Sequence, residues 1–63
     1  MKPRKILRKG EVSTITGLGI STLYKWMAED KFPRSISLGG RSVGWIESEI
    51  FDWINQRIEE RDL

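Results

Sequence analysis

The sequence contains no cysteine and no histidine. Without cysteine there is no disulfide and no thiolate ligand, and without histidine there is no imidazole to act as a base or to bind a metal, so zinc-finger sites are excluded. No pair of buried carboxylates can be identified that would replace these groups in catalysis. We therefore expect no enzyme activity, no catalytic residue, no bound metal and no cofactor.

Long apolar runs are also absent, because no stretch approaches the roughly 20 apolar residues that a membrane-spanning helix needs. The basic start of the chain is followed only by Ile6-Leu7 as apolar sequence, which is too short for a secretory signal. The sequence therefore predicts a cytoplasmic protein with no membrane partner. Its 63 residues are enough for one small domain.

The charges are divided unevenly between the two halves of the chain, although the net charge is only +2. Residues 1–34 hold eight Lys and Arg against three Asp and Glu, whereas residues 35–63 hold three against six. The asymmetry indicates either a polyanionic partner for one face or a solubilising basic tail. We interpret residues 1–5 as a flexible basic arm and residues 6–63 as the folded domain.

Apolar spacing predicts two short helices in the first half of the domain. The first helix is expected at about Lys9 to Thr16, and Gly17 is placed to end it in the left-handed conformation. The second is expected to begin near Gly19 to Ser21 and to run to about Asp30, with one buried stripe formed by Ile20, Leu23, Tyr24 and Met27. Phe32-Pro33 ends this helix, and Phe32 is expected to fold back into the core.

A β-hairpin is predicted next, with Gly39-Gly40, together with Arg41, forming its turn. Its apolar residues are Ile36 and Leu38 on one arm and Val43 and Trp45 on the other, and its apolar side is expected to rest on the helices. A final helix from Glu47 to about Arg61 carries a stripe of Ile46, Ile50, Trp53, Ile54 and Ile58. The predicted fold is therefore mainly α with a small β-hairpin, in the order helix-turn-helix-hairpin wing-helix: a winged helix-turn-helix.

The stretch from Gly17 to Trp26 has the pattern of a helix-turn-helix that presents its second helix to DNA. Thr22 and Lys25 lie off the predicted apolar stripe and are predicted to contact DNA, with Lys25 reaching guanine or phosphate. Ser21 is interpreted either as a capping or first-turn residue of the second helix or as a DNA contact. The Tyr24 hydroxyl is interpreted either as a phosphate contact or as part of the core. At the wing tip, Gly40, Arg41 and Ser42 are predicted to meet phosphate or the minor groove. The three tryptophans are expected in the core rather than as base-stacking platforms.

Several blocks of residues carry a family resemblance that extends from about Ile6 to Arg61. They are Thr16-Gly17-Leu18, Ser21-Thr22-Leu23-Tyr24, Phe32-Pro33, Leu38-Gly39-Gly40-Arg41-Ser42-Val43-Gly44-Trp45 and Glu47-Ser48-Glu49. With these blocks the chain resembles the AlpA-type regulators of phages and mobile elements, which are close in fold to excisionases and MerR-like winged helices. The resemblance implies sequence-specific binding of double-stranded DNA, with the second helix in a major groove, the hairpin on the backbone, and a role in control of a prophage or integrative element.

Three functions stay open at this point. The first is a transcriptional regulator that associates with itself on repeated sites. The second is an excisionase-type recombination directionality factor that bends DNA with a recombinase as partner. The third, from another class, is a protein-interaction module that antagonises a phage repressor or a recombinase through an apolar edge at Phe51 and Trp53.

Overall fold

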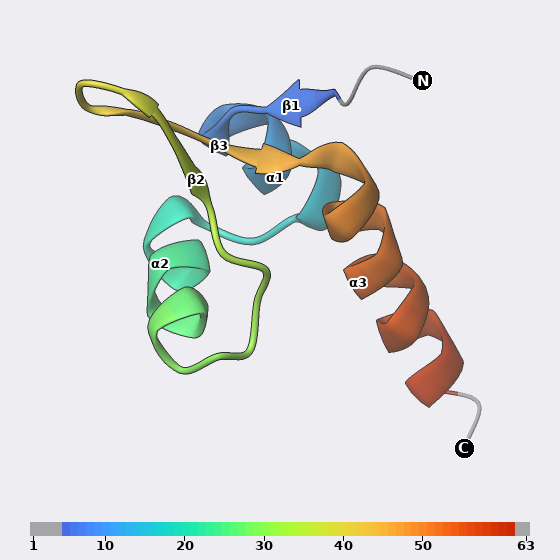
Figure 1. Ribbon diagram of the computed structural model, residues 1–63. Coiled ribbons are helices and arrows are strands. Elements are labelled where there is room, and N and C mark those ends of the chain that lie inside the picture. Colours follow the sequence, from blue (N-terminus) through green and yellow to red (C-terminus); the bar gives the residue numbers. More distant parts are fainter. Residues whose placement is uncertain (1–4, 62–63) are drawn as a thin grey trace.

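The structure is a computed structural model in which residues 5–61 are described. Its elements are β1 (Ile6–Leu7), α1 (Lys9–Thr16), α2 (Ile20–Ala28), β2 (Ile36–Gly39), β3 (Ser42–Ile46) and α3 (Glu47–Glu60). The hairpin of β2 and β3 extends away from the helices at one end, and α3 continues from β3 toward the opposite end (Figure 1). This arrangement confirms the predicted mainly α winged helix-turn-helix.

The turn between α1 and α2 is closed by side chains of α1. Gly17 has a φ of 76°, as predicted, and its N–H donates to the Ser13 carbonyl at 2.8 Å. The Ser13 hydroxyl donates to the Leu18 carbonyl at 2.7 Å, and the Leu18 N–H donates to the Thr16 hydroxyl at 3.2 Å. Serine and threonine are weak helix formers, but here their hydroxyl groups hold the turn that positions α2.

Strand β1 is an element that the sequence did not predict. Ile6 pairs with Ile46 and Leu7 with Trp45, so β3 lies in the middle of a three-stranded antiparallel sheet in the order β1-β3-β2. Residues 1–4 of the predicted arm lie outside the described residues. Its last residue, Lys5, accepts the Glu47 N–H at 2.9 Å on its carbonyl and places its ammonium 3.7 Å from the Glu47 carboxylate.

The hydrophobic core takes one residue from each helix and strand except β2, and one from the segment between α2 and β2. Its buried members are Leu7, Val12, Leu23, Phe32, Trp45 and Ile50. Phe32 lies in the core as predicted, and two indoles hold the segment around it. The Trp45 indole N–H donates to the Pro33 carbonyl and the Trp53 indole N–H donates to the Lys31 carbonyl, each at 3.0 Å.

The buried side of α2 differs from the predicted stripe. Leu23 is fully buried and Met27 is half-buried, but Ile20 and Tyr24 are 40% and 41% exposed. Trp26 is instead on the covered side of α2. Its ring packs against that of Trp53 on α3, with 6.3 Å between the ring centroids. The prediction was therefore wrong for Ile20 and Tyr24.

The hairpin also buries fewer apolar residues than predicted. Residues opposite each other in an antiparallel pair share a face of the sheet, and Ile36 lies opposite Gly44 whereas Ser37 lies opposite Val43. Val43 and Trp45 therefore face the helices, and Ile36 and Leu38 occupy the other face, where they are 38% and 44% exposed. Ile58, expected in the apolar stripe of the last helix, is exposed, and so is Ile15; both line a shallow cavity between α1 and the last turns of α3.

We expect Ile50→Ala to destabilise the domain by about 2–5 kcal/mol, because Ile50 is fully buried and its removal leaves a cavity. The same change at Ile58, on the same helix but exposed, is the matched control and should cost much less. Chemical denaturation of both variants measures the difference. Equal losses would contradict the assignment of α3's buried side.

Candidate nucleic-acid interface

The exposed side of α2 carries four residues at helical spacing. They are Ser21, Tyr24, Lys25 and Ala28. Because Leu23, Trp26 and Met27 face the core, these four residues share one outward face of the helix. Thr22 is half-buried, between Lys25 and Trp26 around the helix, so it lies at the margin of this face. The structure therefore groups three of the four sequence-predicted residues of α2 and sets Thr22 apart.

Tyr24 links the outward face of α2 to the wing. Its ring packs edge-on against the buried ring of Trp45, with 6.2 Å between the centroids. The same residue lines a cavity of about 240 Å³ together with Val43 of β3 and three basic residues, Arg8, Lys9 and Arg41. Tyr24 is therefore held on one side by the core and borders a strongly basic surface on the other.

Arg8 and Lys9 lie in the candidate interface, although no sequence motif singled them out. Both lie at the start of α1, and the cavity brings them beside Arg41, more than 30 positions away in the sequence. The only sequence feature that pointed to them was the excess of Lys and Arg in the first half of the chain, to which both contribute. The amino end of α1 adds partial positive charge at the same place, because a helix dipole is positive there.

The side-chain cations of this surface make no ion pair within residues 5–61, although the Glu11 carboxylate accepts the backbone N–H of Arg8 at 3.1 Å. Lys5, Lys31, Arg34 and Arg57 each lie within 4.0 Å of an Asp or Glu oxygen. Arg8, Lys9, Lys25 and Arg41 make no such ion pair with any carboxylate in residues 5–61. Their charges are consequently available to an anionic partner.

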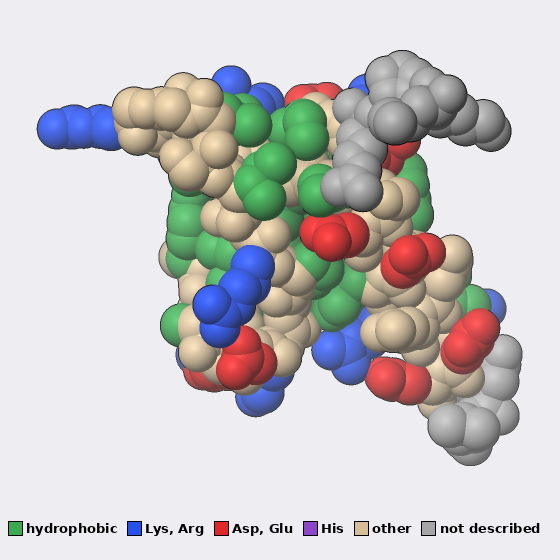
Figure 2. Space-filling model, in the orientation of Figure 1, with side chains coloured by type: hydrophobic (Ala, Val, Ile, Leu, Met, Phe, Trp, Pro, Cys, Tyr) green, Lys and Arg blue, Asp and Glu red, His purple; other side chains and the backbone are tan. Residues whose placement is uncertain are grey.

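The wing tip is a tight turn of Gly40 and Arg41 between the end of β2 and the start of β3. Gly39 and Gly40 have φ values of 113° and 55°, in the region that favours glycine. Arg41 is exposed at the tip, and Ser42, half-buried, pairs with Gly39 at its base. Figure 2 shows a basic side chain reaching out from the end of the hairpin and Asp and Glu gathered along α3.

The described part of the chain contains no group of three or more acidic residues, histidines or cysteines that could hold a metal ion. None of the helices within residues 5–61 is long and apolar enough to cross a membrane.

Comparison with known proteins places these residues in a family context. Residues 5–58 match the family described as prophage CP4-57 regulatory protein (AlpA). The chain is 40% identical over 57 residues to the uncharacterized protein ORF88 of Enterobacteria phage P4, covering 90% of this chain and 65% of that protein. It is 41% identical over 59 residues to the DNA-binding transcriptional activator AlpA of Escherichia coli, covering 84% of each. The chain thus spans just under two thirds of the length of the phage protein. No solved structure matches it.

The two glycines of the wing should differ in what they tolerate. We expect Gly39→Ala to destabilise by about 1–3 kcal/mol, because a φ of 113° is strained for any residue with a Cβ atom. Gly40→Asn should cost less than Gly39→Ala, because asparagine accepts the left-handed conformation at a φ of 55° and no atom lies within 4 Å of a Cβ placed there. Thermal unfolding of both variants measures this. The reverse order would contradict the turn geometry.

Proposed function

The chain belongs to the AlpA family of prophage regulatory proteins, and from this membership we propose that it is a sequence-specific, DNA-binding regulator of transcription from a prophage or integrative element. The observation that carries the proposal is the convergence of Arg8, Lys9, Lys25 and Arg41, none paired with a carboxylate in residues 5–61, around the outward face of α2. The 41%-identical relative described as a DNA-binding transcriptional activator supports the same conclusion.

In this proposal α2 enters the major groove. An α-helix fits the width of that groove, and Ser21 and Lys25 on its exposed side meet base edges or phosphates there. Tyr24, held edge-on by Trp45, turns its hydroxyl to a phosphate. Thr22 contacts DNA only at the margin, because it is half-buried.

The wing and the start of α1 supply backbone contacts. Gly40 lets the tip approach the sugar-phosphate chain closely, Arg41 and Ser42 bind phosphate, and Arg8 and Lys9 bind the phosphates between the wing and α2. Each phosphate that a cation neutralises releases counterions, which favours binding at low salt. The acidic side of α3 does not contact DNA in this proposal, because its carboxylates would repel phosphate.

A single domain of this size covers little DNA, so the proposal includes cooperative self-association on repeated sites. An excisionase-type role, in which the protein bends DNA beside a recombinase, would use the same surface. Footprints on the DNA that flanks the protein's own gene separate the two roles: protected sites that overlap a promoter support regulation of transcription, and sites confined to an attachment region support recombination. Either role would be carried out in the cytoplasm. The absence of any footprint would contradict both.

Arg41→Ala is expected to lower affinity for operator and random DNA by similar factors, because a phosphate contact carries no sequence information. It should also reduce the slope of log affinity against log salt by about one unit. Fluorescence anisotropy at several salt concentrations measures both. Lys31→Ala removes the same charge from an exposed pair with Glu29, outside this surface, and serves as the control with an unchanged slope. Selective loss on A·T-rich flanks would assign Arg41 to the minor groove instead.

Lys25→Ala is expected to weaken operator binding by about 1–3 kcal/mol and to relax base preference at one position, as for a lost base contact. The fold should be unaffected, because the side chain is exposed and makes no ion pair in residues 5–61. Binding to a set of operators randomised one position at a time measures the preference. If operator and random DNA lose affinity equally, Lys25 binds phosphate and another residue reads the sequence.

A further inference from the structure

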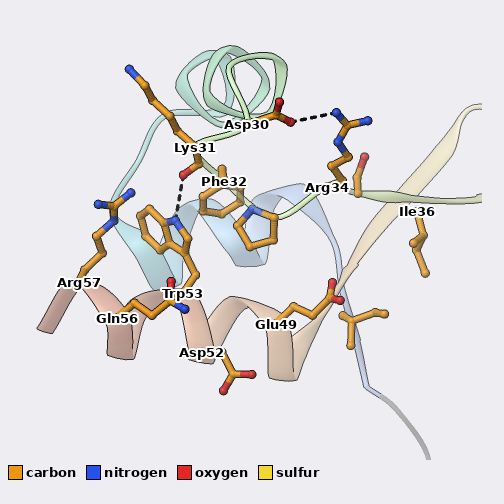
Figure 3. Close-up of a pocket in the computed structure, with 13 residues that line it drawn as sticks. Asp30, Lys31, Phe32, Arg34, Ile36, Glu49, Asp52, Trp53, Gln56 and Arg57 are labelled. Atoms are coloured by element: carbon orange, nitrogen blue, oxygen red, sulfur yellow. Dashed lines mark hydrogen bonds and ion pairs between the residues drawn. The ribbon is translucent and has the colours of Figure 1, made fainter. Parts of the chain in front are cut away.

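A groove of about 790 Å³ lies between α3 and the segment of residues 30–36 that joins α2 to β2 (Figure 3). Its floor is apolar, formed by Phe32, Pro33 and Trp53, and Ile36 and Ile46 lie at the end nearest the sheet. No residue lines both this groove and the basic cavity that contains Tyr24 and Arg41. The groove is therefore distinct from the basic cavity, although Arg34 and Ser35 at one end of it also line a cavity with Tyr24 and Ala28 of α2.

One wall of the groove is acidic. Glu49, Asp52 and Gln56 follow one another at helical spacing along the same side of α3. In Figure 3 Glu49 lies nearer the segment of residues 30–36, whereas the Asp52 side chain points away from that segment, at the outer edge of the groove. A ligand in the groove would pass Glu49 and would meet Asp52 only at the outer edge.

The other charges that line the groove are already compensated. Arg34 lies 2.9 Å from Asp30, Lys31 lies 3.2 Å from Glu29, and Arg57 lies 3.0 Å from Glu60. Glu49 and Asp52 have neither an ion pair nor a side-chain hydrogen bond with any residue in 5–61. Glu49 and Asp52 are thus the charged residues of the groove that make no ion pair within residues 5–61, and they lie beside an apolar floor.

Exposed apolar side chains extend the groove across the outer face of the sheet. Ile36 and Leu38 are exposed there, and a Cβ atom on Gly44 would lie 2.5 Å from Ile6 Cγ2 and 3.2 Å from Leu38 Cδ1. Ile6 and Leu38 therefore come together over Gly44. Figure 2 shows this hydrophobic surface over the strands, adjoining carboxylates at the start of α3. Contiguous apolar surface of this kind is typical of an interaction site.

We propose that the groove and the outer face of the sheet bind a segment of another protein that alternates cationic and apolar side chains. The apolar side chains of the segment would cover Ile36 and Leu38, and its Lys or Arg would meet Glu49 and Asp52. DNA cannot be the occupant, because the two carboxylates repel phosphate. The inference does not depend on the proposed function, because its carboxylates and apolar residues are not among the proposed DNA contacts.

The first experiment is an NMR titration of the full, ¹⁵N-labelled chain with a synthetic peptide of alternating Lys and Leu. About seven residues suffice, because an extended segment of that length spans roughly 23 Å. DNA is omitted, since a cationic peptide would bind it. We expect saturable shifts at Ile36, Ile46 and the Trp53 indole that weaken with added salt. Peptides that alternate Lys with Ser, or Glu with Leu, should not saturate. Shifts centred on α2, or equal binding of all three peptides, would overturn the proposal.

The second experiment uses two charge-matched double variants. Glu49→Gln with Asp52→Asn should weaken binding of the Lys-Leu peptide by about 2- to 30-fold, as expected for two exposed ion pairs. Glu11→Gln with Glu59→Gln removes the same charge outside the groove and should leave binding unchanged. Thermal unfolding confirms that both variants are folded. Equal weakening by both doubles would show a general effect of net charge and contradict the site.

Analytical sedimentation of the chain alone tests whether the occupant of the groove is a second copy of this chain rather than a different protein. We expect a monomer whose groove resonances do not change on dilution. Self-association that is lost in the Glu49→Gln, Asp52→Asn variant would show that the basic surface of another copy fills the groove, and the proposal of a different partner protein would be wrong.

Discussion

The indole of Trp45 lies where the sheet, α2 and the segment before β2 meet. Its side chain is fully buried, it pairs across the sheet with Leu7, and its N–H donates to the Pro33 carbonyl at 3.0 Å. Burial of an aromatic side chain of this size removes about 150–250 Å² from water, which contributes about 4–6 kcal/mol. In a domain of 63 residues that is a large part of the total stability, so the positions of the surrounding elements depend on this one residue.

The same residue sets the distance between the two parts of the candidate interface. Trp45 belongs to β3, the strand that begins at the wing tip, and its ring contacts Tyr24 on the exposed side of α2. A rigid strand with one end in the core and the other at Arg41 therefore fixes the wing relative to α2. A surface positioned in this way loses little conformational freedom on binding, which favours affinity.

Separation of charge gives the small domain two different faces. The basic residues without carboxylate partners lie around α2, the start of α1 and the wing, and the carboxylates Glu49 and Asp52 lie along α3 beside apolar surface. If the charges were mixed, each face would bind its partner more weakly. The arrangement is suited to a protein that holds DNA on one side and another protein on the other.

The order and bounds of most elements could be predicted from the sequence, because local signals define them. Gly17 ends α1, Phe32-Pro33 follows α2, and Gly39-Gly40 reverses the chain between β2 and β3. The membership in a regulator family and the basic character of one half of the chain were likewise readable from the residues. These features depend on residue type and spacing, which need no knowledge of distant contacts.

Only the tertiary structure decided which side of each element is covered. The spacing of apolar residues in α2 allowed more than one buried face, and the contact of Trp26 with Trp53 selected the one that leaves Tyr24 exposed. Arg8 and Arg41 line the same cavity, and β1 pairs with β3. Each of these contacts joins segments more than 30 positions apart in the sequence. Periodicity encodes the spacing of side chains along one element, whereas the neighbour that covers them is set by the packing of the whole chain.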